Sequence, residues 1–401
     1  MPMRPRLPLA LAFVLGACSA QPAVQPAPAP AGVPAASDPA VLHAAHHAYR
    51  VVTVAEGLVN PWSMAWLPNG DMLVTERPGR LRIVRNGRLL PDPVAGLPAI
   101  RGGGQGGLLD VVAHPQFAGN RLVYIAYSKP SPDTLQGATA VARARFENDR
   151  LVGLEDIIVT KTWSRGRGHH GARLVFDGRG HLFVSLGDRQ VAPEGDLTAH
   201  PAQDLMNHFG KILRLNEDGS VPADNPFQGR STATPEIWSY GHRNVQGMTI
   251  HPGTGALLAT EHGPQGGDEL NVILPGRNYG WPVVGFGVNY RTGSAIHAGT
   301  HREGMEQPAH IWVPSIGTSG LIVYTGDRFP GWKGSVLAGG LVGEQLGRLT
   351  MDGNRVTNVE LLAQRIGRIR DVRQGPDGFI YLAIEHRQGQ PTPIVRLEPA
   401  R

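Results

Sequence analysis

Two adjacent histidines and a distant aspartate are the first residues whose types and spacing suggest acid/base chemistry. His169 and His170 follow a stretch rich in Arg and Gly and precede the apolar run 173–176. Asp188 ends the next apolar run, fifteen residues after Arg173. If the two runs form a β-hairpin, their flanking loops lie on one rim and a His can meet the carboxylate as a proton-transfer pair. The pattern also fits a solvated His pair and an Asp in a turn, so both interpretations stay open at this point.

Two further loops carry polar side chains between apolar segments. The loop 241–247 places Arg243 among several hydrogen-bond donors, where its guanidinium could hold a carboxylate or a developing oxyanion. The loop 102–107 matches G-x-G-x-x-G, but a strand pattern and not a helix follows it, so we do not expect a dinucleotide site. Gln105 in this loop is either a surface residue or part of a site.

Oxygen donors and paired arginines suggest sites for a cation and for an anion. Glu261, Gly263, Pro264, Asp268 and Glu269 share one loop region, whose carbonyls and carboxylates are the ligand types that Ca²⁺ prefers. Arg368 and Arg370 alternate along one strand pattern, which is a costly arrangement unless an anion faces them.

The elements that must position these residues read as short β-strands bounded by Gly, Pro, Asn and Asp. An apolar strand, a tight turn and a second apolar strand recur at six places: 64–75, 108–127, 174–186, 248–260, 321–338 and 372–384. Six diverged copies predict an all-β, six-bladed β-propeller, with a sandwich or two unrelated β domains as the alternatives. Because propellers close by pairing the chain ends, we expect strand 49–54 to join strand 393–397.

Composition and charge exclude several classes of protein. The chain has 401 residues, 41% hydrophobic and 18% charged, so it is not a charged disordered protein. Its 53 Gly and 34 Pro favour a turn-rich fold. The net charge of +5 comes from arginines spread along the chain, so no nucleic-acid partner is expected. A single Cys excludes a disulfide framework within the chain.

The N-terminus has the pattern of an export signal. Residues 1–17 carry two arginines and then an apolar run too short to span a bilayer, which predicts a signal peptide. The run ends Leu-Gly-Ala-Cys18, similar to a bacterial lipobox, although an ordinary cleaved signal is the alternative. We expect residues 18–45 to be an Ala/Pro-rich tether and 46–401 to be the catalytic propeller. The protein is then exported, periplasmic and held at the membrane only by the lipid on Cys18.

Together these stretches resemble the soluble quinoprotein sugar dehydrogenases, the glucose/sorbosone dehydrogenase family that uses pyrroloquinoline quinone (PQQ). The resemblance is closer to the aldose sugar dehydrogenase branch than to the dimeric glucose enzymes. It covers about residues 50–398 through ordered motifs, which are 104–109, His169 with Arg173, Gly187-Asp188, 241–247, Gly263-Pro264 with Asp268-Glu269, 278–282 and 368–371. The fold of that family is a six-bladed propeller.

The resemblance implies a role for each matching residue. His169, four residues before Arg173, would be the base that takes the proton from the sugar C1 hydroxyl, and Asp188 would stabilise its imidazole. Gln105 and Arg243 would contact the reacting oxygens and the cofactor. Asn244, Arg368 and Arg370 would bind the carboxylates of PQQ.

The resemblance also implies calcium. The carbonyls of Gly263 and Pro264 would hold a calcium ion that polarises the quinone, and Glu269 with the Tyr279 carbonyl matches a further structural calcium site. The chain departs from the family at Val342, which stands where a Lys commonly contacts the cofactor. Trp312 would either cover the quinone or pack in the core.

The function expected from sequence is therefore a PQQ- and Ca²⁺-dependent dehydrogenase that oxidises the C1 hydroxyl of aldoses to lactones. Its partners would be the aldose and an external electron acceptor, a quinone or a cytochrome, and we expect a monomer. The alternative is a calcium-dependent propeller hydrolase such as a lactonase. A binding module without chemistry is a third class, but it would leave His169 and Asp188 unexplained.

Overall fold

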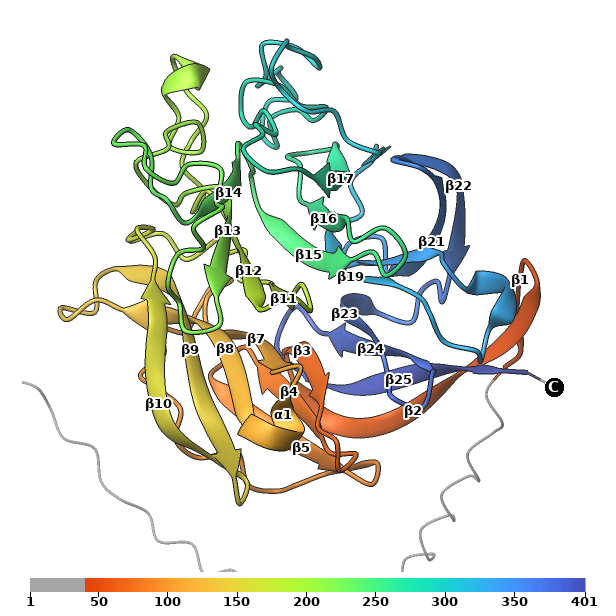
Figure 1. Ribbon diagram of the computed structural model, residues 1–401. Helices are drawn as coiled ribbons and strands as arrows, with labels where there is room; N and C mark the ends of the chain where they lie inside the picture. Colours follow the sequence, from red (N-terminus) through yellow and green to blue (C-terminus); the bar gives the residue numbers. More distant parts are fainter. Residues whose placement is uncertain (1–39, 401) are drawn as a thin grey trace, which may run out of the picture. The chain divides into compact units, whose positions relative to one another are not determined.

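The computed structural model describes residues 40–400 and consists of six antiparallel sheets arranged around a central axis (Figure 1). Five sheets have four strands and the sixth has five, so the predicted six-bladed β-propeller is confirmed. The expected signal peptide and most of the expected tether lie outside the described residues. The end of the tether region does not, because strand β1 (Leu42–Ala44) pairs with β2 and the described fold starts before residue 46.

The first three blades follow the chain in order. Blade 1 consists of β3 (Pro61–Trp66), β4 (Met72–Glu76), β5 (Arg80–Arg85) and β6 (Arg88–Leu89). Blade 2 consists of β7 (Leu108–Ala113), β8 (Leu122–Pro130), β9 (Gly137–Glu147) and β10 (Arg150–Val159), with the short helix α1 (Phe117–Asn120) between its first two strands. Blade 3 consists of β11 (Leu174–Phe176), β12 (His181–Leu186), β13 (Lys211–Asn216) and β14 (Ile237–Tyr240), with the 3-10 turn η1 (Leu197–Ala199) after β12.

The last three blades complete the ring. Blade 4 consists of β15 (Val245–Ile250), β16 (Leu257–Glu261), β17 (Asp268–Ile273) and β18 (His310–Trp312). Blade 5 consists of β19 (Thr318–Val323), β20 (Val336–Gly340), β21 (Gln345–Asp352) and β22 (Arg355–Leu362), with η2 (Pro330–Trp332) after β19. Blade 6 consists of β23 (Arg368–Gln374), β24 (Ile380–Glu385) and β25 (Pro391–Pro399), completed by β2 (His47–Val59) and β1.

The two ends of the described chain close the ring in blade 6. Strand β2 pairs antiparallel with β25, with Val51 opposite Leu397 and Tyr49 opposite Pro399. The closure expected between 49–54 and 393–397 is therefore confirmed. His47 at the start of β2 also packs against blade 5, because its ring lies edge-on against Phe329 and Trp332, and its Nε2 accepts the Gly331 N–H at 3.0 Å.

The turns between strands follow from local sequence. After β3 the chain reads Pro68-Asn69-Gly70, and Gly70 has a φ of +89°, a left-handed conformation that L side chains disfavour. The Asn69 side chain bonds Asp71 across this turn. Strand β4 follows with every residue buried, because it packs between neighbouring strands and neighbouring blades.

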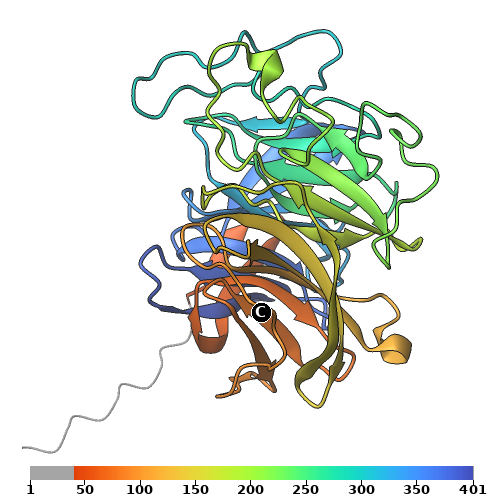
Figure 2. The same cartoon turned by 90° about the vertical axis from the view of Figure 1, so that its left-hand side faces the viewer.

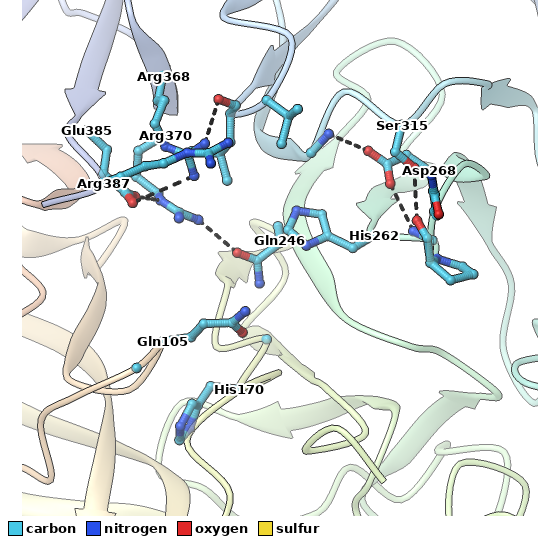
Figure 3. A pocket seen from close by; sticks show the side chains of 18 of the residues that line it. Gln105, His170, Gln246, His262, Asp268, Ser315, Arg368, Arg370, Glu385 and Arg387 are labelled. Carbon is cyan, nitrogen blue, oxygen red and sulfur yellow. Dashed lines mark hydrogen bonds and ion pairs between the residues drawn. The ribbon is translucent and has the colours of Figure 1, made fainter. Parts of the chain in front are cut away.

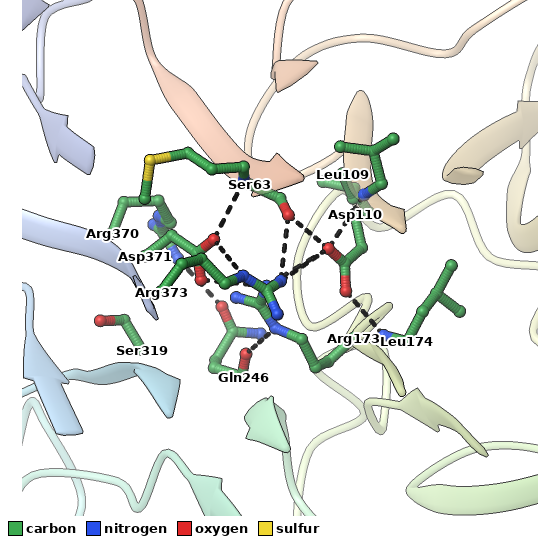
Figure 4. Close-up of polar contacts among 12 residues, drawn as sticks. Ser63, Leu109, Asp110, Arg173, Leu174, Gln246, Ser319, Arg370, Asp371 and Arg373 are labelled. Carbon is green, nitrogen blue, oxygen red and sulfur yellow. Dashed lines mark hydrogen bonds and ion pairs between the residues drawn. The ribbon is translucent and has the colours of Figure 1, made fainter. Parts of the chain in front are cut away.

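Hydrophobic clusters fill the spaces between blades, and a polar cluster fills the axis. The inner strands of the six blades contact one another around that axis. There Asp110, Arg173, Asp371 and Arg373 form a buried ionic cluster, drawn in Figure 4. Arg173 Nη1 lies 3.1 Å from Asp371, and Arg373 Nη2 lies 3.1 Å from Asp110. Two carboxylates and two guanidinium groups compensate each other there, as buried charges require.

Long loops of two blades project beyond the strands on one side (Figure 2). The segments 187–210 and 274–309 meet there, since Gln203 Nε2 donates to the Trp281 carbonyl at 2.6 Å. Within residues 40–400, no helix has the length and apolar character needed to cross a membrane.

Candidate active site

A cavity of about 530 Å³ is lined by residues of the inner strands β3, β7, β15 and β23 and by loop residues at 104–105, 262–266 and within 314–317, and Figure 3 shows its walls. One wall carries Arg368, Arg370, Arg387 and Glu385 and is called the arginine wall. Asp268 and Ser315 lie on the opposite wall. A third side is formed by Gln105 and His170. Of the predicted site residues, this cavity is lined by Gln105, Gly263, Pro264, Arg368 and Arg370.

His169 and Asp188 meet beside this cavity, as the hairpin argument predicted. His169 Nδ1 lies 2.6 Å from Asp188 Oδ1. Asp188 is 1% exposed, and it also accepts the Trp281 indole N–H and the Gln190 amide, each at 2.8 Å. A carboxylate can only accept, so Nδ1 of His169 carries the proton and Nε2 keeps its lone pair for a substrate.

Burial and nearby charges keep the imidazole of His169 neutral. Burial is the main cause that lowers the pKa of His169 below its ordinary value of 6.5, and Arg243 and Arg189 act in the same direction against Asp188. Burial alone would raise the pKa of Asp188, but His169 and Arg243 hold it below its ordinary value. The pair is thus a neutral imidazole beside an ionised carboxylate, which is the arrangement of a general base.

Gln105 and His170 flank this pair differently. Gln105 Oε1 accepts the backbone N–H of His169 at 2.7 Å and so fixes the loop that carries His169. The Nε2 group of Gln105 is on the other side of its amide and faces away from that bond. His170 has no carboxylate partner, and its Nδ1 lies 3.3 Å from Thr139 Oγ1. The structure therefore gives the acid/base partner to His169 and not to its neighbour.

Arg243 is held from several sides. Its carbonyl accepts the Asp188 N–H at 2.8 Å, and its own N–H donates to Glu261 Oε2 at 2.8 Å. Its guanidinium lies over the Trp281 ring at 5.2 Å and donates to the His262 carbonyl at 3.2 Å. Arg243 lines a second, smaller cavity of about 20 Å³ behind residues 262–264, while its charge still reaches His169.

Ser239, His242 and Glu261 have the hydrogen bonds of a hydrolase triad, but a substrate cannot reach them. Ser239 Oγ lies 2.9 Å from His242 Nε2, and His242 Nδ1 lies 3.0 Å from Glu261. Both Ser239 and His242 are fully buried, so no ester carbonyl can reach the hydroxyl. Because Glu261 also accepts the backbone N–H of Arg243, these three residues position the loop 241–247.

Asn244 and Gln246 connect the loop that carries His169 to the wall that carries Arg370. Asn244 Oδ1 accepts the Gly171 N–H at 3.1 Å and the Gln246 Nε2 group at 3.3 Å. Gln246 Oε1 accepts from Arg370 Nη1 at 3.0 Å, and its carbonyl accepts from Arg173 in the axial cluster at 2.8 Å. Gln246 belongs to the loop 241–247 but received no role from sequence.

The arginine wall contains an anion that sequence reasoning missed. Arg370 Nε lies 2.5 Å from Glu385 Oε2, and Arg77 and Arg368 lie 3.8 and 3.9 Å from Oε1 of the same carboxylate. The protein therefore supplies part of the negative charge that the two strand arginines require. The cavity keeps an excess of two positive charges, because four arginines and two carboxylates line it. The Nε atoms of Arg77 and Arg368 are buried without a partner.

The expected calcium ligands border the smaller cavity. Gly263, Pro264, Glu269 and Tyr279 line it together with Glu261. Glu261 and Glu269 are register partners on β16 and β17, and burial together with Glu261 raises the pKa of Glu269 to about 8. Two carboxylates in one buried place call for a cation.

The loop that carries Gly263 and Pro264 is pinned by one carboxylate. Asp268 accepts the N–H groups of Gly263 at 3.0 Å, Gly317 at 2.6 Å and Thr318 at 3.0 Å. The first bond fixes the Gly263 end of the turn, and the other two tie the same carboxylate to the segment that begins β19. Among residues 40–400, no group of three or more His, Cys, Asp or Glu side chains converges on a point, so a cation here also needs carbonyl ligands.

Two remaining expectations concern Val342 and Trp312. Val342 lines the large cavity and is 58% exposed, so it contributes an apolar rim in place of a charge. Trp312 packs in a hydrophobic cluster with Leu258 and Leu270 and does not line the large cavity. Of its two expected roles, the structure favours the core.

Comparison with known proteins places this site in a family. The model of the family described as "Glucose / Sorbosone dehydrogenase" matches residues 58–396. The chain belongs to this family. It is 40% identical to the aldose sugar dehydrogenase YliI of Escherichia coli (strain K12), over 88% of this chain and 94% of that protein. The family and the fold that the sequence motifs implied are both confirmed, and the activity class is that of a sugar dehydrogenase.

Solved structures of similar proteins agree. The apo form of the soluble aldose sugar dehydrogenase from Escherichia coli is 37% identical with a TM-score of 0.80, and the match covers 88% of this chain and 100% of that chain. The PQQ-bound form of the aldose sugar dehydrogenase from Streptomyces coelicolor is 27% identical with a TM-score of 0.70, and the match covers 88% and 98%.

Proposed function

We propose that this protein is a PQQ- and calcium-dependent dehydrogenase that oxidises the C1 hydroxyl of aldoses to lactones. The observation that carries the proposal is the cationic cavity beside a neutral histidine that is backed by a buried carboxylate. The PQQ-bound state of a family member of the same fold supports the choice of cofactor.

The residues of the large cavity fit PQQ, which carries three carboxylates. The cavity has an excess of positive charge, and the Nε atoms of Arg77 and Arg368 are buried without an acceptor. Arg368 and Arg370 would hold the carboxylates, since guanidinium groups bind them through paired hydrogen bonds. Asn244 is linked to Arg370 by two hydrogen bonds through Gln246, so we assign it to positioning as well as to cofactor binding.

The residues of the small cavity fit calcium. Its volume of about 20 Å³ is large enough for a water-sized occupant. Burial and the proximity of Glu261 raise the pKa of Glu269 to about 8, and a bound cation would relieve this repulsion between the carboxylates. At the structural calcium site the Tyr279 carbonyl would join Glu269, and at the site that faces the cofactor the carbonyls of Gly263 and Pro264, which border both cavities, would hold the ion. Carbonyl oxygens are hard ligands that Ca²⁺ prefers. Calcium placed at the 263–264 carbonyls would also act as a Lewis acid toward a quinone oxygen.

Oxidation of an aldose at C1 removes a proton from the hydroxyl and a hydride from the carbon. His169 Nε2 takes the proton, and Asp188 stabilises the imidazolium that results. Gln105 and Arg243 orient the hydroxyl and the neighbouring oxygens, and Arg243 adds positive charge where negative charge develops. PQQ, when bound, supplies the two-electron acceptor for the hydride.

We propose that the electrons leave to an external acceptor, a quinone or a cytochrome, and that the protein works as a monomer in the periplasm. The sequence pattern of an export signal at 1–17, followed by Cys18, supports the periplasmic part of this proposal. A Cys18→Ser variant should move from the membrane fraction to the soluble fraction. Retention in the membrane fraction would contradict the lipid anchor.

The hydrolase alternative predicts several carboxylate or Asn ligands around one metal. Residues 40–400 contain no such group of carboxylates, and the buried Ser239 cannot serve as a nucleophile. The arginine wall has no task in hydrolysis. The quinone interpretation accounts for both observations.

The decisive assay reconstitutes the apo protein with PQQ and Ca²⁺ and measures dye reduction with a panel of aldoses. We expect activity only when both are present, and His169→Ala should abolish turnover while PQQ binding persists. Hydrolysis of lactones without any dependence on PQQ would overturn the proposal.

A further inference from the structure

Arg189 is a buried arginine that forms no ion pair with a carboxylate among the described residues. It is 2% exposed, and its guanidinium donates to the carbonyls of Gly166 at 2.7 Å and of Gly168. A third carbonyl, that of Gly137 on β9, lies at 3.5 Å. Burial lowers the pKa of Arg189 to about 10, so the group stays charged at neutral pH. A buried charge held only by carbonyls is costly, and nothing in the reaction described so far uses it.

The place of Arg189 in the chain links it to the proton acceptor. It follows Asp188 directly, and its guanidinium grips the segment 164–168 that leads into His169. Its backbone N–H donates to the His169 carbonyl at 3.3 Å. The two halves of the acid/base pair thus come from two segments that one side chain joins.

The segment that leads into His169 and the segment that follows β12 pack closely, with no space for larger residues at their glycines. A Cβ on Gly168 would lie 2.0 Å from Gln190 Oε1, and a Cβ on Gly187 would lie 2.3 Å from the His169 carbonyl. His169, Arg189 and Gln190 all have positive φ angles, of 44°, 57° and 61°. Such backbone is strained for side-chain-bearing residues and persists only where contacts such as those of Arg189 hold it.

Several charged or titratable groups face the His169 imidazole. Asp188 favours its protonated form, while Arg243 and Arg189 oppose it. His170 follows in the chain, and His262 approaches from the end of β16. The charge of Arg189 opposes protonation of both His169 and His170. Of the two arginines beside His169, only Arg189 also holds the loop that carries the imidazole.

We propose that Arg189 is a positioning residue for the proton acceptor: its guanidinium fixes the loop that presents His169 to Asp188. Because this guanidinium is bonded to the carbonyl of Gly168, the residue before His169, its positive charge also disfavours a second positive charge on the nearby imidazole. The role of His169 as the base rests on the proposed function, whereas the geometry and charge of Arg189 do not. Two properties of one side chain are therefore separable, the fork that binds two carbonyls and the positive charge.

Two variants separate these properties. Arg189→Lys keeps the charge and loses the fork, and Arg189→Met keeps an apolar stem and loses both. Arg165→Met is the matched control, because Arg165 lies in the same segment but is exposed. Each is measured for the pH profile of kcat/KM with PQQ and Ca²⁺, and for the His169 titration in the apo protein by NMR. The His169 signal is identified by its absence in His169→Gln.

We expect Arg189→Met to move the His169 titration and the acid limb of kcat/KM to higher pH and to lower kcat about 10- to 100-fold, because the base is displaced. Arg189→Lys should keep the wild-type titration while kcat still falls. Arg165→Met should match the wild type in both. If Arg189→Met does not fold, the Lys variant still tests the fork, since the inference requires a lowered kcat with an unmoved titration.

Other results would overturn the inference. Unchanged kcat in both variants would show that the loop needs no fork, and an unmoved titration in Arg189→Met would show that the charge does not act on His169. If the apo titrations behave as expected but no variant and no wild-type protein shows PQQ-dependent turnover, the proposed function fails and the role of Arg189 stands.

Discussion

Replacing Asp188 with asparagine removes one charge and one acceptor from the acid/base pair while keeping the size of the side chain. Oδ1 accepts from His169 Nδ1 and from Gln190, and Oδ2 accepts from Trp281 Nε1. Asparagine has a single oxygen for these three donors. If the oxygen faces Trp281, the amide NH₂ faces His169 and forces the tautomer with hydrogen on Nε2, which blocks the base. If it faces His169, the buried indole N–H loses its acceptor, which costs about 1–3 kcal/mol.

Loss of the negative charge of Asp188 accounts for the larger part of the expected decrease in kcat. At about 4 Å and an effective dielectric constant of about 20, a carboxylate stabilises an imidazolium by about 4 kcal/mol. About 1.4 kcal/mol corresponds to a tenfold change in rate, so kcat should fall by about 10³. Loss of the carboxylate also lowers the pKa of His169 further, which moves the acid limb of the rate profile to lower pH.

The assay compares kcat and PQQ affinity in wild-type protein and in Asp188→Asn. Asp188 does not line the large cavity, so the Kd for PQQ should stay within a few-fold of wild type. A kcat within tenfold of wild type would refute the reasoning. A loss of PQQ binding in proportion to the loss of kcat would also refute it, because the residue would then act through the cofactor.

Two further predictions concern stability. Burial lowers the pKa of His170 well below 6.5, so the folded state resists a proton that the unfolded state takes up, and the free energy of unfolding should decrease as the pH falls below 6.5. His170→Asn should therefore show a smaller decrease in Tm between pH 7.5 and pH 5.5 than wild type, and an equal decrease would contradict the assignment. Glu269→Gln removes one of two facing carboxylates, so it should raise the Tm of the calcium-free protein and diminish the rise in Tm on adding Ca²⁺; an unchanged calcium response would place the cation elsewhere.

The fold was predictable because its signals are local. The predicted unit 174–186 coincides with β11 and β12, and the predicted unit 64–75 lies within the hairpin of β3 and β4. The unit repeated six times gave the number of blades. The long hairpins β9–β10 and β21–β22 were not singled out, since they lie outside the repeated strand-turn-strand unit and face solvent along much of their outer strands.

The candidate site was predictable where a turn or a hairpin fixes the geometry. His169 and Asp188 flank one hairpin, so spacing alone brought them together. The same argument could have found Glu385, which pairs with Arg368 across the hairpin of β23 and β24. Trp281 could not be found in this way, because the segment 274–309 between β17 and β18 has no periodicity that places it beside Asp188.

The central claim is that the arginine wall binds the carboxylates of PQQ, and a binding titration tests it most directly. Apo protein is titrated with PQQ by calorimetry in excess Ca²⁺, together with Arg370→Ala and, as an exposed control from the same wall, Arg387→Ala. We predict saturable binding of one PQQ per chain, weakened about 10- to 100-fold in Arg370→Ala because a charged hydrogen bond is lost, and weakened less in Arg387→Ala. The absence of saturable binding by the wild-type protein with calcium in excess would contradict the account.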